Sequence, residues 1–280
     1  ISLRSVLLMD ADVCLYQTAP ETPFNFQFIL DQFKSSDDTS SETPLKIGSL
    51  IVTRANVTYD KKWLPRHHLG FDANHLAVTD IHTNLSFNLA GNDSIHLRVR
   101  KFSCNESCGF SIKNVRFNAH VNKNLVTIAD PNISLPNTEI VADKPITINL
   151  SAKPYPIVNG DLRIKTLATR DFQHLDARLQ NVNLRFNGLV KAQMNDAHAE
   201  IAVNLKEKQQ HFNLELHSSI QNHDNFNIRL DKLVADSVFL STLTSLVTND
   251  ELRKIKNLGH VTILGNATYH KHASIGDAHI

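Results

Sequence analysis

The chain has 280 residues, enough for one large or two smaller β domains and for a sizeable buried core. Lys and Arg number 29 against 28 Asp and Glu, so the formal charge is +1 and no basic excess points to nucleic acid. Nine glycines and nine prolines are too few for a collagen-like or low-complexity chain.

The first 44 residues combine a strand pattern, a helix pattern and a polar segment. Val6–Tyr16 is an apolar run typical of a strand. In Phe24–Lys34 the apolar side chains recur at helical spacing, and Pro23 suits the first turn of a helix. We therefore expect a leading strand and a short helix within residues 1–34. Small polar side chains dominate residues 35–44 and predict a flexible linker.

Residues 45–235 are dominated by apolar side chains that alternate with polar ones. Successive side chains of a strand point to opposite faces, so each segment has one apolar and one polar face, as in antiparallel sheets. The alternating sets lie in Val115–Val121, Ile146–Leu150, Val182–Phe186, Ile201–Leu205, Phe212–Leu216 and Phe226–Leu230. We expect antiparallel β-sheet repeats throughout this region.

Short polar segments between these sets predict tight turns. They are Asn122–Asn124, Asn159–Gly160, Asn187–Gly188, Asn195–Asp196 and Lys206–Gln209. Because short loops pair neighbouring strands, this spacing favours a meander over crossover connections.

Residues 236–280 read as a helical stretch followed by the start of another strand repeat. Ser237–Asn257 carries apolar residues at helical spacing. Asn249–Asp250 is expected to cap a second short helix, which Gly259 would end.

No motif in the sequence indicates catalysis. It lacks the nucleophile elbow of hydrolases and the glycine-rich loops that cradle phosphates. We therefore expect a non-enzyme with no catalytic residue and no cofactor. His270 and His272 would share a strand face, but no further ligand lies in register, so we expect them to be solvated and predict no metal site. His211 and His217 share the parity of a polar face and are also expected to be wet.

The three cysteines do not form a disulfide framework. Cys104 and Cys108 flank an expected hairpin tip, where a disulfide could close a small loop in an oxidising compartment. Two free thiols are the alternative. Cys14 lies in an apolar strand and is expected to be a small core residue.

A sheet with one continuous apolar face needs a cover, because exposed apolar surface costs ~25 cal/mol per Å². A second sheet, closure into a barrel or a bound apolar ligand could each supply one. Periodicity alone does not distinguish these three, and on base rates the alternating sets are the core of a β-sandwich.

The order of these parts carries a resemblance. The leading strand Val6–Tyr16 and the helix within Phe24–Phe33 precede two longer strand patterns, Pro44–Asp60 and His75–Leu89. Leu258–Gly265 then supplies a strand and a glycine after a helical stretch. This order resembles the repeat unit of the TamB/AsmA-like family of bacterial envelope proteins, above all the TamB branch of Bacteroidetes-type bacteria.

The resemblance implies a mainly β chain with a long curved antiparallel sheet, a β-taco, and one or two short helices. It implies an internal fragment of a periplasmic protein whose inner-membrane anchor lies outside this chain. Such proteins bind phospholipid acyl chains in an apolar groove and carry lipid from the inner to the outer membrane. The expected groove lining is Val115, Phe117, Val121, Val182, Leu184, Phe186, Ile201, Val203, Leu205, Phe212, Leu214 and Leu216.

On this reading Phe186→Asp would place a charge in the groove and abolish lipid transfer. The alternative function is a structural scaffold that assists outer-membrane protein assembly or autotransporter translocation. Its exposed strand edges would pair with an outer-membrane barrel protein, and its core would be closed and dry.

Overall fold

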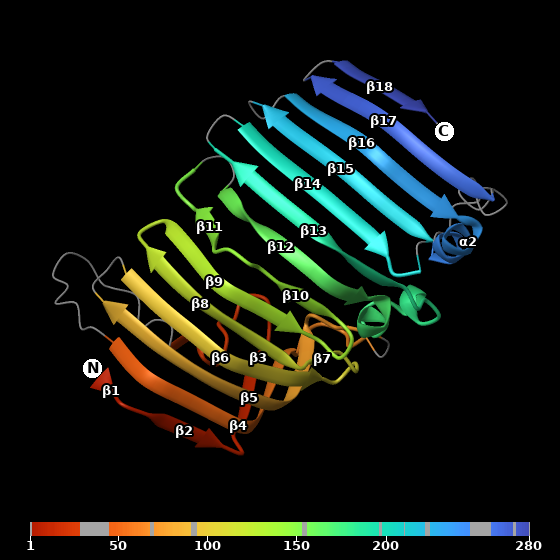
Figure 1. The fold of residues 1–280 in the computed structure, drawn as a ribbon. Coiled ribbons are helices and arrows are strands. Elements are labelled where there is room, and N and C mark those ends of the chain that lie inside the picture. The colour runs from red at the N-terminus through yellow and green to blue at the C-terminus, as the bar shows by residue number, and fades with distance from the viewer. Residues whose placement is uncertain are drawn as a thin grey trace. The chain divides into compact units, whose positions relative to one another are not determined.

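The structure is a computed structural model that describes residues 2–28, 45–67, 70–90, 94–152, 156–195, 198–209, 211–221, 225–246, 259–270 and 273–279. It is mainly β, and its strands form a long mixed sheet (Figure 1), as the predicted fold class requires. The chain divides into two compact units. Unit 1 comprises residues 1–123, 134–136 and 174–177, and unit 2 comprises residues 124–133, 137–173 and 178–280.

Unit 1 is built on four long strands that pair in chain order. Its strands are β1 (Ser2–Leu3), β2 (Val6–Met9), β3 (Asp12–Gln17), β4 (Leu45–Lys61), β5 (His75–Ala90), β6 (Ser94–Glu106), β7 (Ser111–Ile112) and β8 (Asn114–Asn122). β4, β5, β6 and β8 pair antiparallel. β1, β2 and β3 instead lie parallel along β4, so the sheet is mixed rather than wholly antiparallel. The connection of residues 18–44 is long enough for the crossover that parallel pairing needs.

Unit 2 contains the remaining strands and the helices. The strands are β9 (Leu125–Ser134), β10 (Glu139–Val141), β11 (Ile146–Asn149), β12 (Ile157–Ala168), β13 (Arg185–Met194), β14 (His198–Glu207), β15 (Phe212–Gln221), β16 (Asn225–Asp236), β17 (His260–His270) and β18 (Ala273–His279). Short 3-10 helices span Thr169–Phe172 and Ala177–Leu179. β12 to β18 pair antiparallel in chain order (Figure 1), which is the predicted meander.

Helix α2 (Ser237–Leu246) begins where the predicted helical stretch begins. Asp236 caps its first turn, since its Oδ1 accepts a hydrogen bond from the backbone N–H of Phe239 at 2.9 Å. The second helix predicted near Asn249–Asp250 lies outside the described residues, as does the linker at 35–44. In the helix predicted over Phe24–Lys34, Gln27 and Phe28 are helical. The rest of that prediction, residues 29–34, lies outside the described residues.

Two of the five predicted turns are confirmed. Turns occur at Lys123–Asn124 and Lys208–Gln209. Asp196 of the turn predicted at Asn195–Asp196 lies outside the described residues, although the side-chain Oδ1 of Asn195 accepts a hydrogen bond from the backbone N–H of His198 at 2.9 Å.

The two predicted Asn–Gly turns are wrong, because Asn159–Gly160 lies inside β12 and Asn187–Gly188 inside β13. The glycines permit close approach between strands rather than a reversal of the chain. A Cβ on Gly160 would lie 2.9 Å from Cγ1 of Ile146, and one on Gly188 would lie 2.0 Å from the backbone oxygen of Asn204.

The best-buried apolar cluster of unit 2 lies under α2, at one end of the sheet. It consists of Ala235, Phe239, Leu240 and Val261, which are 4–8% exposed. Leu184, Phe186, Phe212 and Ile263 pack against it. One short helix therefore covers one end of the strands, and this end holds most of the dry core of unit 2.

Candidate functional site

The strand register gives unit 2 one apolar and one polar face. Across β12 to β16 one row of successive pairing partners is entirely apolar: Leu162, Val190, Val203, Leu216 and Leu230. The row displaced by one residue reads Asp161, Lys191, Ala202, His217 and Arg229. Because neighbouring residues of a strand point to opposite sides, these two rows lie on opposite faces of the same sheet.

The apolar face continues beyond that row but is only half-buried away from α2. A second row contains Ile164, Leu205, Leu214, Leu233 and Ile263, with Gly188 at the position on β13. Leu162 and Ile228 are each 36% exposed. Among the described residues, no large side chain is less than 2% exposed. We call the part of this face that lies away from α2 the open stretch.

Unit 1 has the same two-faced construction. Leu50, Leu85, Val99 and Phe117 are successive partners across β4, β5, β6 and β8. The opposite face carries Ser86, Arg98 and Asn118 in register. Its apolar face thus follows from the same period-two pattern that gives unit 2 its apolar face.

The structure sorts the predicted lining residues other than Val182 into three groups. Val115, Phe117 and Val121 lie on β8 in unit 1, on the apolar side. Ile201, Val203, Leu205, Leu214 and Leu216 come together on the apolar face of unit 2. Leu184, Phe186 and Phe212 belong to the cluster under α2.

Val182 departs from the strand predicted for it. It precedes β13, which begins at Arg185, and is only 4% exposed. Its backbone oxygen accepts a hydrogen bond from the Thr169 hydroxyl at 2.8 Å, so it closes the segment between the two short 3-10 helices and β13. It is a packing residue and not part of the open stretch.

Phe186 also has a different environment from the one predicted. Its ring meets those of Phe212 and Phe239 edge-on, with centroids 5.9 Å and 6.4 Å away. Phe212 and Phe239 stack on each other at 4.4 Å. A charge introduced at Phe186 would therefore disrupt the packing of α2. The variant Phe186→Asp tests the stability of the covered end and not the open stretch.

Sequence reasoning missed Leu162 and Val190 in the central apolar row. Both follow an Asn–Gly pair by two residues, and the turns predicted at Asn159–Gly160 and Asn187–Gly188 removed them from the expected strands. The sequence does carry a signal for these strands. Apolar residues follow each glycine closely, namely Leu162 and Ile164 after Gly160 and Leu189–Val190 after Gly188.

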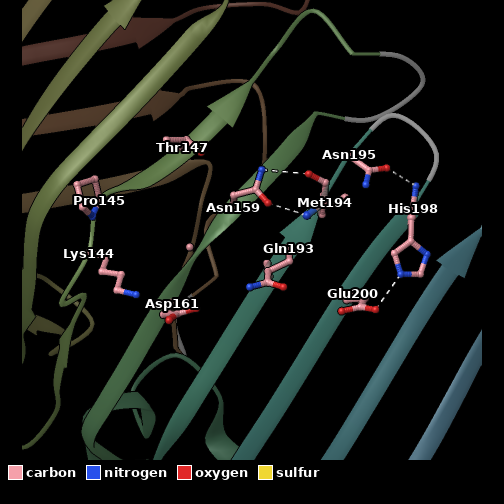
Figure 2. A pocket seen from close by; sticks show the side chains of 12 residues that line it. Lys144, Pro145, Thr147, Asn159, Asp161, Gln193, Met194, Asn195, His198 and Glu200 are labelled. Atoms are coloured by element: carbon pink, nitrogen blue, oxygen red, sulfur yellow. Dashed lines mark hydrogen bonds and ion pairs between the residues drawn. The ribbon is translucent and has the colours of Figure 1, made fainter.

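A pocket of about 590 Å³ opens beside β11, β12, β13 and β14 (Figure 2). Asp161 and Glu200 reach it from the polar face of the sheet, and Lys144 from the connection between β10 and β11. The imidazole of His198 points to Glu200, with Nε2 3.0 Å from Oε1. The pocket forms where β13 diverges from β12. There the side-chain amide of Asn159 accepts a hydrogen bond from N–H of Met194 at 2.7 Å and donates one to its carbonyl at 3.1 Å.

The mixed charge of this pocket suits water better than an acyl chain. Among the described residues no group of three His, Cys, Asp or Glu side chains is placed to hold a metal ion. His217 projects on the polar face with its side chain 53% exposed and paired to Asp231, as predicted. His211 is less exposed than predicted, at 25%, because it pairs with Asp236 at 2.5 Å. The predictions for His270 and His272 stay open, because His272 and the side chain of His270 lie outside the described part of the chain.

The cysteines are free thiols in the structure. Cys104 is buried in β6 opposite Ile112 of β7, and Cys108 lies in the turn between these strands. Burial raises the pKa of both thiols, and the neighbouring Glu106 raises that of Cys108 further. Cys14 is exposed on β3, contrary to the prediction of a core position, because β3 pairs along the margin of β4 and buries little.

Comparisons with family models, with curated proteins and with solved structures found no match to this chain. Among the helices of the described residues none has the length and apolar character needed to cross a bilayer.

Proposed function

We propose that this chain is a non-catalytic lipid-handling module whose open stretch binds phospholipid acyl chains. The observation that carries the proposal is the unbroken apolar row from Leu162 to Leu230, on a face of unit 2 that α2 covers only at one end. Leu162 and Ile228 on this face of unit 2 are each 36% exposed.

An acyl chain matches such a surface in chemistry and in size. It needs no polar partner, and each methylene removed from water contributes ~0.8 kcal/mol. Five neighbouring strands at ~4.8 Å spacing extend roughly 19 Å across the sheet. One acyl chain spans half of the hydrocarbon core of a bilayer, about 15 Å. The row is longer than that, so one acyl chain fits across it.

The opposite face keeps the protein in water while the apolar face holds lipid. Lys191, His217 and Arg229 lie behind the apolar row, and polar Asn, Gln and Glu side chains surround them. A sheet with this division can take up lipid on one side without a second protein layer on the other.

The resemblance to the TamB/AsmA-like family supplies the proposed setting. We place the module in the periplasm, as a piece of a protein anchored in the inner membrane outside this chain. Phospholipid would pass along the sheet from the inner to the outer membrane, and an outer-membrane barrel protein is the proposed partner at the far end.

The test is mass spectrometry of solvent extracts from gently purified protein. Val190→Thr with Val203→Thr adds two hydroxyls to adjacent partners on the apolar face while keeping β-branched side chains. Leu189→Thr with Val234→Thr makes the matched change on the polar face. We expect stoichiometric phospholipid in the parent and the control and at least about tenfold less in Val190→Thr/Val203→Thr, since each buried hydroxyl without a partner costs ~1–3 kcal/mol. Lipid-free parent protein would contradict the proposal.

One observation favours the scaffold as a second candidate. The short strands along β4 expose large apolar side chains: Leu3 is 42%, Leu7 58%, Leu8 46% and Met9 53% exposed. Exposed apolar side chains gathered on neighbouring strands mark a surface that contacts a partner protein. If the chain is a scaffold, Leu7→Lys should abolish capture of a barrel protein and leave the amount of extracted lipid unchanged. If it transports lipid, Val190→Thr/Val203→Thr should lower the amount of extracted lipid and leave capture of a barrel protein unchanged.

A further inference from the structure

The connection between β4 and β5 in unit 1 is held closed at its base. The backbone N–H of Lys61 donates to the carbonyl of Asn74 at 2.9 Å, and that of Leu64 donates to Lys61 at 2.9 Å. The N–H of Lys62 donates to the carbonyl of Gln17 at 2.9 Å, which ties the connection to the end of β3. The described part of this loop, residues 62–67 and 70–74, therefore has a fixed place at one end of the unit.

The carboxylate of Asp72 in this loop and that of Asp60 at the end of β4 are both engaged in contacts with the loop or its base. The Asp72 side chain is 7% exposed and accepts hydrogen bonds from the backbone N–H groups of His67 and Asn74 at 2.9 Å and 3.0 Å. These backbone donors, with His75 at 2.8 Å, lower the pKa of Asp72 to about 2 against the opposing effect of burial. Asp60, 21% exposed, accepts from Arg66 at 2.6 Å and lies 3.4 Å from Nε2 of His75.

The outward surface of the same loop is aromatic and cationic. Trp63 is 39% exposed and Phe71 is 45% exposed. The guanidinium side chain of Arg66 is 64% exposed although one of its nitrogens contacts Asp60. Lys62 is exposed and holds its ammonium 3.9 Å from the ring centre of Tyr16, while His67 is exposed beside Pro65. Glu21, in the turn after β3, is the exposed acidic residue of the adjoining segment.

This combination matches the interface of a lipid bilayer. Trp is enriched at the headgroup level because its ring is apolar while its N–H is polar. Exposed Lys and Arg side chains are attracted to anionic headgroups over about a Debye length. With Asp72 buried and Asp60 paired to Arg66, the loop presents cations and aromatic rings outward, which is complementary to a negatively charged membrane surface.

We propose that the β4–β5 loop docks this chain on the surface of a bilayer that contains anionic phospholipid. Trp63 and Phe71 enter the interface, and Lys62 and Arg66 lie at the level of the phosphates. The docking rests on the loop alone and does not require that the open stretch bind acyl chains.

The chain has a single tryptophan, so its fluorescence reports on this loop directly. The probes are vesicles of phosphatidylcholine with and without phosphatidylglycerol, and the same vesicles with brominated acyl chains. We expect the Trp63 emission to shift to shorter wavelength with anionic vesicles, to be quenched by bromine, and to revert at high salt. Emission that is unchanged by either vesicle, as for a loop that binds a protein, would overturn the proposal.

Matched variants localise the effect. Phe71→Ser removes one exposed ring and is expected to weaken binding to anionic vesicles about tenfold. Leu125→Ser changes a side chain of similar exposure, 46%, on β9 of unit 2 and should leave binding unchanged. Equal weakening by both variants would overturn the assignment to this loop. Val190→Thr/Val203→Thr should bind vesicles like the parent, so loss of acyl-chain binding and loss of docking are separately visible.

Discussion

The two ends of the apolar face of unit 2 have the same strand pattern and different surroundings. Under α2, Phe239 and Val261 are 8% and 7% exposed. On the open stretch Leu162 and Ile228 are both 36% exposed. Alternation of apolar and polar residues therefore fixes which side chains share a face, whereas a ten-residue helix decides which of them are dry. The open stretch is a surface that the fold prepares and leaves for another molecule to cover.

The largest effect is expected at the covered end. Phe239→Ala removes a ring that stacks on Phe212 and touches Phe186 edge-on. It should lower the free energy of unfolding by about 4 kcal/mol, because a cavity forms beneath α2. Urea denaturation measures this loss. A value below about 1 kcal/mol would mean that α2 does not seal this end.

The backbone of β13 two residues from Phe186 is expected to be almost as sensitive. A Cβ on Gly188 would lie 2.0 Å from the carbonyl oxygen of Asn204, so β13 and β14 must separate to admit it. Gly188→Ala should cost about 3 kcal/mol by the same measurement. Gly259→Ala is the control, since a Cβ there meets no atom within 4 Å, and it should be near neutral.

Side chains of the open stretch should contribute little to folding. Ile228→Ala is expected to cost about 1 kcal/mol, because more than a third of the side chain remains in water in the folded protein. A loss as large as that of Phe239→Ala would erase the difference between the two regions and indicate a covered core.

Acid should loosen the covered end more than the open stretch. Burial tends to raise the pKa of Asp236, but the N–H of Phe239 and the imidazole of His211 outweigh it and hold the pKa below its usual value. A depressed carboxyl pKa stabilises the fold above the usual value near 4, and that contribution is lost as pH falls below it. Asp236→Asn keeps a capping side chain, so its stability should fall less than the parent's between pH 5 and about pH 3. Parallel pH curves for the two proteins would show that this cap is not responsible.

Particular residues show how far the sequence alone could lead. Ile201, Val203, Leu214 and Leu216 were predicted to share a face, and they do, because period two has a direct geometric meaning in a strand. The surroundings of Phe186 could not be predicted in this way, because they depend on where α2 folds back.

The Asn–Gly pairs were mistaken for turns for a different reason. Hairpin statistics describe isolated turns, whereas the side chain of Asn159 replaces missing pairing between β12 and β13. No pattern in the sequence singled out the β4–β5 loop. The burial of Asp72 and the pairing of Asp60 with Arg66, which leave the outside cationic, are tertiary features with no signature in the sequence.

The central claim concerns what covers the open stretch, and photo-crosslinking tests it most directly. A phospholipid with a diazirine in its acyl chain would be bound to the purified protein, irradiated, and its attachment sites located by peptide mass spectrometry. We predict labels on the apolar row, at Val190, Val203 and Leu216, and none on Lys191 or His217 behind it. Labels spread equally over both faces, or confined to the polar face, would contradict an acyl-chain surface on this sheet.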